Sequence, residues 1–211
     1  HPQKLEKQIT FLKDNPQFMA CFTWVDFIDE NGNCNNDSVD WMCNLFRCST
    51  DTREEWLRFF FFKGNRLAKP SALVQMSAAR AVGRHTMAFV QAHDFDWWVR
   101  FTKRYSFAVM EEPLVQIRRF SASSLNTSGV GEEQNNRFLN EHMMIRAHFF
   151  DDMDADDLVH VFGQNFINPH AESYEELECE KAFLLLRCDD LKATYPIWGL
   201  YKLAELLQEP E

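Results

Sequence analysis

The fold is set by one apolar stretch, residues 18–28, which reads FMACFTWVDFI. It is rich in aromatic and β-branched residues and ends at residues 29–32, DENG, a sequence typical of turns. An apolar run of this length that closes on a turn predicts a buried β-strand. Apolar residues recur at helical spacing over residues 5–12, until Asn15 and Pro16 end the pattern, so we expect a helix before the strand.

Helix and strand patterns continue on both sides of a low-complexity loop, residues 121–131, SASSLNTSGVG. Before this loop we expect helices at 52–63, 77–82 and 94–105, and short strands at 71–75, 107–110 and 114–117. Residues 33–48 show no clear period. After the loop, amphipathic patterns predict helices at 132–150, 154–162, 173–188 and 197–207. The expected fold class is therefore α/β (α+β) and helix-rich, with a first domain at 1–130 and a helical tail at 131–211.

Composition and charge narrow the classes of partner. The 211 residues are 45% hydrophobic and 26% charged, which is ordinary for a globular protein and argues against disorder. The formal net charge of −10 repels phosphate backbones, so nucleic acid is not an expected partner. Six cysteines without a CxxC spacing predict reduced thiols, and hence a cytoplasmic protein. Because the sequence begins with His1 and not with Met, we expect a segment of a longer protein.

Three stretches, in this order, resemble the family 2 glycosyltransferases of the GT-A fold. The first has the pattern Pro-x-Lys-Leu-x-x-Gln at residues 2–8, followed by the strand and turn at residues 22–32. The second has Lys-Gly-Asn at residues 63–65, Pro-Ser at 70–71 and Val-Gly at 82–83. The third has His-Asp-Phe-Asp-Trp-Trp-Val-Arg at residues 93–100, followed by Glu-Pro-Leu at 112–114 and Arg-Arg at 118–119. Their order and spacing make the resemblance specific over the first domain.

The resemblance implies both a fold and a reaction. It identifies residues 1–130 as the acceptor-side, C-terminal part of a GT-A Rossmann-like domain that lacks its N-terminal nucleotide-binding half and the Asp-x-Asp metal motif. Inverting members of the family transfer a sugar from a nucleotide sugar to an acceptor hydroxyl, whose proton is taken by one carboxylate. By carry-over, this catalytic base is Asp94. The same resemblance implies substrate-binding roles for His93, Trp97, Asn65, Arg118 and Arg119.

Two positions depart from the family pattern. His93 stands where the family usually has Glu, and Phe120 stands where many members have a His that helps to hold the metal. We therefore expect no metal site in this chain, although the full-length enzyme would use divalent Mn or Mg on the nucleotide diphosphate. Arg118 and Arg119 are adjacent on a predicted strand and point to opposite faces, so at most one of them reaches a diphosphate.

Simpler structural roles compete with several of these assignments. Asp94 opens a predicted helix, and aspartate is a good helix cap. Asp96 and Arg100 have the i, i+4 spacing of a surface ion pair. Trp97 and Trp98 are of a type found more often in a core than as a platform for a sugar, although one of them could line the cleft.

The implied partners are a nucleotide sugar and a saccharide or lipid-linked acceptor, in cell-surface polysaccharide synthesis at the inner face of the membrane. Without the donor half, residues 1–211 alone are expected to be inactive. A sheet that lacks neighbouring strands exposes an edge, so we expect association with a second copy or cover from the tail helices. The alternative is a non-enzymatic domain that binds a partner protein.

Overall fold

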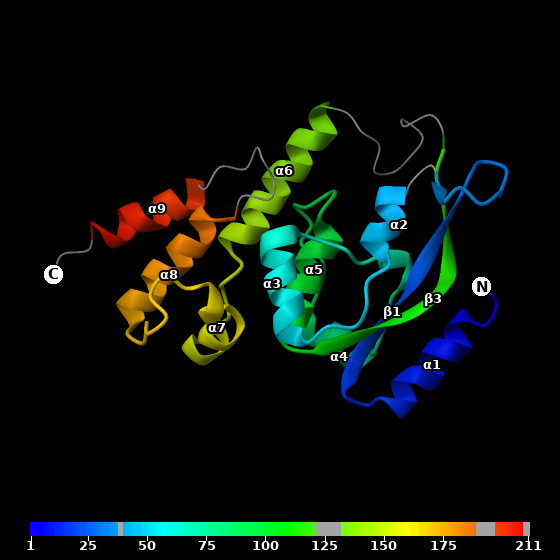
Figure 1. The fold of residues 1–211 in the computed structure, drawn as a ribbon, viewed down its shortest axis with the longest axis horizontal. Coiled ribbons are helices and arrows are strands. Elements are labelled where there is room, and N and C mark those ends of the chain that lie inside the picture. The colour runs from blue at the N-terminus through cyan, green and yellow to red at the C-terminus, as the bar shows by residue number, and fades with distance from the viewer. Residues whose placement is uncertain (38–39, 121–131, 189–196, 209–211) are drawn as a thin grey trace. The chain divides into compact units, whose positions relative to one another are not determined.

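The computed structural model describes residues 1–37, 40–120, 132–188 and 197–208, and it divides into two compact units (Figure 1). The sheet unit comprises His1–Arg53 and Asn65–Gln134, and the helical unit comprises Glu54–Gly64 and Asn135–Glu211. The chain therefore leaves the sheet unit for one helix, returns to it, and then leaves again. The expected domain boundary near residue 130 falls in the loop 121–131, which lies outside the described residues.

The sheet has three strands in the order β2-β1-β3. β1 (Phe18–Ile28) is the strand predicted from the apolar stretch. β2 (Leu73–Val74) pairs with β1 antiparallel, and β3 (Ser106–Arg118) pairs with it in parallel from one end to the other. Figure 1 shows β1 and β3 side by side. The turn after β1 contains Gly32 at φ +91°, a backbone conformation that glycine adopts without steric cost.

β3 corrects one prediction. The two strand-like runs around Pro113 form a single strand of 13 residues, and the interruption is a β-bulge within it. Opposite Thr23 lies Met110, whereas the next residue of β1, Trp24, lies opposite Pro113. Proline has no N–H to donate, and it is tolerated in a strand at a bulge or at a sheet edge; β3 provides both within the described sheet.

The sheet unit also contains helices that largely follow the predicted patterns. They are α1 (Lys4–Asp14), α2 (Asp40–Phe46), the 3-10 turn η2 (Lys69–Ser71), α4 (Met76–Val82) and α5 (His93–Thr102). The predicted helices before β1, at 77–82 and at 94–105 are confirmed as α1, α4 and α5. α2 was not predicted, because seven residues make fewer than two turns and show no measurable period.

Aromatic packing fixes the helices against β1. The ring of Phe22 lies 4.7 Å from the ring of Trp98 on α5 and 5.1 Å from that of Phe107 on β3, measured between ring centroids. Farther along β1, Phe27 belongs to a buried cluster with Cys43 of α2. α5 is thus held to the sheet by its buried face, which leaves its first turn half exposed.

The helical unit contains the remaining described helices. They are α3 (Arg53–Lys63), α6 (Glu132–Ala147), α7 (Ala155–Phe162), the 3-10 turn η4 (Gly163–Asn165), α8 (Tyr174–Leu186) and α9 (Ile197–Leu206). The four helices predicted after the loop are confirmed. Ser173 caps α8 through a capping box with Glu176, and Asp154 caps α7 by accepting from the Asp157 N–H at 2.8 Å. The molecule is therefore mixed α/β and rich in helix, as expected.

Several of the 20 phenylalanines of the chain pack together in the core of the helical unit. Phe61 of α3 packs on Phe149, Phe150 and Phe162, with ring centroids 5.1 to 5.3 Å apart. The carbonyl of Phe61 also accepts a hydrogen bond from Arg146 Nε at 3.0 Å. Phe61 therefore joins α3 to the residues that follow it in the helical unit, through both its ring and its carbonyl.

α8 and α9 approach each other closely at Gly199. A Cβ atom at this position would lie 2.8 Å from the Leu186 backbone nitrogen and 2.9 Å from the Ala182 carbonyl oxygen, both on α8. These distances are shorter than van der Waals contact, so a larger residue could not occupy the site without moving one of the helices.

All six cysteines carry free thiols, as predicted. Burial raises the pKa of Cys21 and of Cys48 to about 11, so both thiols are protonated at neutral pH. Among the described helices, none combines the length and the apolar character needed to cross a membrane.

Candidate functional site

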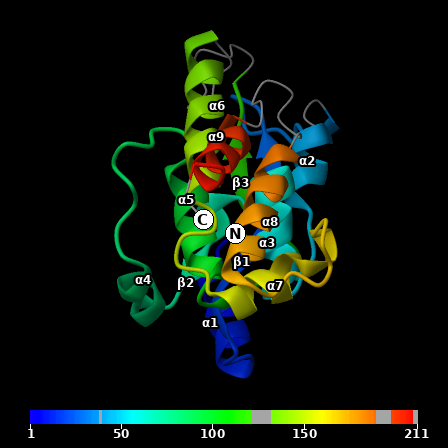
Figure 2. The same ribbon diagram turned by 90° about the vertical axis from the view of Figure 1, so that its left-hand side faces the viewer.

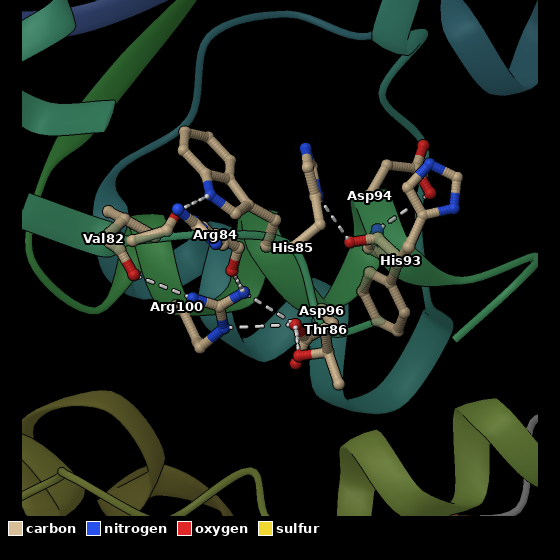
Figure 3. A network of polar contacts seen from close by, with 11 residues as sticks. Val82, Arg84, His85, Thr86, His93, Asp94, Asp96 and Arg100 are labelled. Carbon is tan, nitrogen blue, oxygen red and sulfur yellow. Dashed lines mark hydrogen bonds and ion pairs between the residues drawn. The ribbon is translucent and has the colours of Figure 1, made fainter. Parts of the chain in front are cut away.

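The loop between α4 and α5 runs along α5 in the opposite direction and is tied to it at several points (Figures 2 and 3). Arg100 donates to the carbonyl oxygens of Val82 at 2.8 Å and Arg84 at 2.9 Å. The same guanidinium forms the predicted ion pair with Asp96, at 2.9 Å and 3.1 Å, and Thr86 donates to Asp96 from the loop at 2.8 Å. Asp96 and Arg100 thus act together as a clamp that fixes the path of the loop.

Trp97 belongs to the same clamp. The residue is only 6% exposed, and its Nε1 donates to the carbonyl of Gly83 at 2.8 Å. The ring packs against Phe101 and Trp98, with centroids 5.4 Å and 4.8 Å apart. Little of the ring is left to meet a sugar, so its visible role is to hold the start of the loop, while the substrate-binding role stays a prediction.

Asp94 occupies the second position of α5, one residue after the helix begins and two after its N-cap, Ala92. Its Oδ1 accepts a hydrogen bond from the Phe95 N–H at 2.9 Å, one of the donors that the first turn of a helix leaves unsatisfied. Within the described residues, Oδ2 has no hydrogen-bond partner, and the side chain is half-buried. One oxygen is therefore anchored and the other is available to accept a proton.

Around His93, the residue before Asp94, lies a basic group that we call the Lys69 cluster, made of Lys69, His85 and His93. Lys69 Nζ lies 2.6 Å from His93 Nε2, and His93 Nδ1 lies 3.2 Å from the Val90 carbonyl oxygen. His85 Nδ1 lies 3.0 Å from the His93 carbonyl oxygen, and the two imidazole centroids are 5.4 Å apart. Figure 3 shows both histidines with Asp94 at the start of α5.

The hydrogen bonds assign the protons of the Lys69 cluster. A carbonyl oxygen only accepts, so Nδ1 of His85 and Nδ1 of His93 each carry a hydrogen. An ammonium group only donates, so His93 Nε2 is an acceptor and its ring is neutral. Lys69 uses one of its three N–H groups in this bond and keeps two for other partners.

Lys69 is positioned by residues from the first two resembling stretches. It opens η2, whose Ser71 hydroxyl donates to the Ala68 carbonyl at 2.8 Å and accepts from the Thr23 N–H of β1 at 3.2 Å. Gln8 of α1 is fully buried, and its amide donates to the carbonyls of Ser71 at 2.9 Å and Cys21 at 3.1 Å. Gln8 and Ser71 therefore join α1, β1 and η2, and they set the place of Lys69.

The other predicted residues lie elsewhere in the sheet unit. Asn65 Oδ1 accepts from the Leu67 N–H at 2.9 Å, which shapes the segment that leads to η2. The Arg118 guanidinium donates to the carbonyl oxygens of Asp29 and Glu30 in the turn after β1. The Arg119 backbone N–H donates to the carbonyl of Ile28 at 2.9 Å. The structure thus brings His93 and Trp97 to the helix of Asp94, and it makes no hydrogen bond between that helix and Asn65 or Arg118.

The divalent metal that the resemblance implies for the full-length enzyme would need a set of oxygen, nitrogen or sulfur ligands. Nowhere in the described part of the chain do three or more His, Cys, Asp or Glu side chains lie close enough to hold a metal ion. Arg118, near the place where family members carry a metal-binding His, is used in the turn after β1. The described residues therefore provide no set of ligands for a metal ion.

Comparison with known proteins supports the resemblance at a coarse level. The chain is 29% identical over 118 residues to an uncharacterized glycosyltransferase of Methanocaldococcus jannaschii. The matched part is 56% of this chain and 37% of that protein, so the chain spans well under half of the length of its relative. No protein-family model and no solved structure matches the chain. The chain is thus related to a glycosyltransferase, and family 2 membership remains an expectation from the motifs.

Proposed function

We propose that this chain is the acceptor side of an inverting glycosyltransferase of family 2 and that Asp94 is its general base. The observation that carries the proposal is the Asp94 carboxylate, with Oδ1 held by the helix and Oδ2 without a partner in the described residues. The relationship to an uncharacterized glycosyltransferase supports the reaction class.

In this mechanism the base acts on the acceptor. As the acceptor hydroxyl attacks the anomeric carbon of the donor sugar, its proton moves to Asp94 Oδ2, and the bond to the nucleotide diphosphate breaks. The anchoring of Oδ1 by Phe95 N–H restricts rotation of the carboxylate, so that Oδ2 keeps one direction. The Arg100–Asp96 clamp keeps the loop 83–92 beside this first turn, and it acts as a positioning element without touching the reacting atoms.

The wider reaction follows from the family resemblance. The donor would be a nucleotide sugar, the acceptor a saccharide or a lipid-linked saccharide, and the setting cell-surface polysaccharide synthesis at the cytoplasmic side of a membrane. The resemblance places the nucleotide-binding half outside residues 1–211, so we propose that this segment alone does not turn over a nucleotide sugar. Turnover of any nucleotide sugar by the isolated segment would contradict that part of the proposal.

The test replaces Asp94 by asparagine in the full-length protein and measures transfer from a panel of nucleotide sugars. Asparagine retains the shape and an acceptor for the Phe95 N–H, but it cannot take the proton, so kcat should fall by about 100-fold to 10,000-fold. Asp14→Asn is the matched control, because Asp14 is exposed at the end of α1 and has no polar partner among the described residues. It should leave kcat unchanged. An Asp94→Asn enzyme with wild-type kcat would remove Asp94 from the proposed role.

A further inference from the structure

The Lys69 cluster places a positive charge at His93, the residue before Asp94, in a chain that is otherwise strongly acidic, with a net charge of −10. Lys69 is exposed on η2, His85 is exposed on the loop, and His93 is half-buried on α5. They come from three separate segments and meet at His93, the residue before Asp94, through contacts of 2.6 Å to its Nε2 and 3.0 Å to its carbonyl oxygen. This convergence is a built feature of the fold, since η2 is itself held by buried Gln8 and Ser71.

The charge of Lys69 is not neutralised inside the protein. No carboxylate in the described part of the chain lies within ion-pair distance of Lys69. The nearest acidic residue after Asp94 along α5 is Asp96, which is occupied by Arg100 and Thr86. Two N–H groups of the ammonium therefore remain available to an anion, and a hydrogen bond between two charged groups is about twice as strong as a neutral one.

The geometry of an inverting transfer indicates which substrate would bring that anion. The acceptor oxygen attacks one face of the anomeric carbon while the diphosphate leaves from the opposite face. The base touches the attacking hydroxyl, so residues around the base face the acceptor, and the departing phosphates lie on the far side of the sugar ring. A cation held by the residue next to the base is therefore poorly placed for the donor diphosphate and well placed for a group on the acceptor.

We propose that the Lys69 cluster is an acceptor subsite for an anionic group, so that the acceptor carries a carboxylate or a phosphate near the hydroxyl that is glycosylated. Lys69 binds the anion with its two remaining N–H groups, and His93 holds the ammonium in place through its neutral Nε2. His85 donates to the backbone carbonyl of His93 and packs edge-on against its ring, with centroids 5.4 Å apart. This inference rests on the proposed function for its assignment to the acceptor, while binding of the anion itself does not require turnover.

The experiment measures binding to the full-length protein by calorimetry and by the imidazole signals in nuclear magnetic resonance spectra. The probes are D-glucuronate, D-glucose and inorganic phosphate. We expect saturable binding of glucuronate and of phosphate that shifts the His93 and His85 signals, with glucose at least about tenfold weaker, as the loss of one charged contact implies. Lys69→Gln should weaken both anions by about tenfold or more, whereas Lys13→Gln, an exposed lysine at the end of α1, should bind them like wild type.

Two outcomes would overturn the proposal. Either glucuronate and phosphate fail to bind the wild type, or Lys69→Gln binds them as tightly as the wild type, which would leave Lys69 with the purely structural task of joining η2 to α5. The Asp94→Asn protein separates the two proposals. It should bind both anions at least as tightly as the wild type because a repelling carboxylate is gone, even though its turnover is lost. Full turnover in that variant would refute the role of the base and leave the anion binding intact.

Discussion

Replacing Arg100 by alanine should loosen the loop that leads to Asp94, and the cost can be worked out from its contacts. The side chain donates to two backbone carbonyls and pairs with Asp96, and it is 30% exposed while Asp96 is 15% exposed. Two hydrogen bonds at about 1 kcal/mol each, plus a part-exposed ion pair at about 0.5 to 1 kcal/mol, give a loss of about 2 to 3 kcal/mol. For a chain of this size that corresponds to a melting temperature lower by roughly 5 to 10 °C.

The assay follows thermal and urea unfolding by tryptophan fluorescence, since Trp97 reports on the start of the same loop. Arg100→Lys keeps the charge but not the planar fork that reaches both carbonyls, so it should lose about half of that stability. A double-mutant cycle with Asp96→Asn should give a coupling energy of about 0.5 to 1 kcal/mol. In the full-length enzyme, kcat/KM should fall with Arg100→Ala because the loop beside Asp94 is no longer fixed. A melting temperature for Arg100→Ala within about 1 °C of wild type would refute this reasoning.

Two further predictions concern the helical unit. Gly199→Ala should destabilise this unit by about 1 to 3 kcal/mol and speed amide exchange in α9, because the new Cβ overlaps the α8 backbone. Gly163→Ala is the control and should cause no such loss of stability, because its Cβ makes only an ordinary contact at 3.5 Å. Equal melting temperatures for the two variants would contradict the overlap. Burial, together with the nearby positive charge of Arg146, lowers the pKa of His142 to about 3. As the pH falls below about 6.5, His142 therefore binds a proton in the unfolded chain but stays unprotonated in the folded chain. The free energy of unfolding should therefore be at its full value above pH 6.5 and lower by about 2 to 3 kcal/mol at pH 4.5. Urea midpoints at pH 7.5 and 4.5 measure this difference. His142→Gln should remove this part of the pH dependence, whereas His148→Gln, at an exposed histidine, should keep it.

The elements that could be predicted from the sequence are those with a strong local signal. β1 has an apolar run that ends at a turn. Asp154 caps α7, and Ser173 with Glu176 caps α8, and all three are residue types typical of a helix start. α2 was not predicted because its seven residues are too few to show a helical period of apolar residues. β3 was divided in two because Pro113 breaks a local pattern, while the bulge that accommodates it exists only through pairing with β1.

The candidate site was predictable only in part, for a related reason. The i, i+4 spacing of Asp96 and Arg100 predicted their ion pair, since both partners lie on one helix. Lys69 and His85 carry no local signal, because their proximity to His93 depends on the return of the loop along α5 and on the attachment of η2 to β1. Gln8 was visible as one letter of a motif, but its role in joining three elements required the folded structure.

The excursion of α3 into the helical unit has a consequence for the order in which the protein is made. Phe61 leaves the ribosome well before Phe149, Phe150 and Phe162, the rings that bury it. During that interval the Phe61 ring lacks these native contacts, and β1 lacks its pairing with β3. A chaperone that binds exposed apolar segments would thus meet residues 59–62, FFFF, before the rings that pack on Phe61 are made.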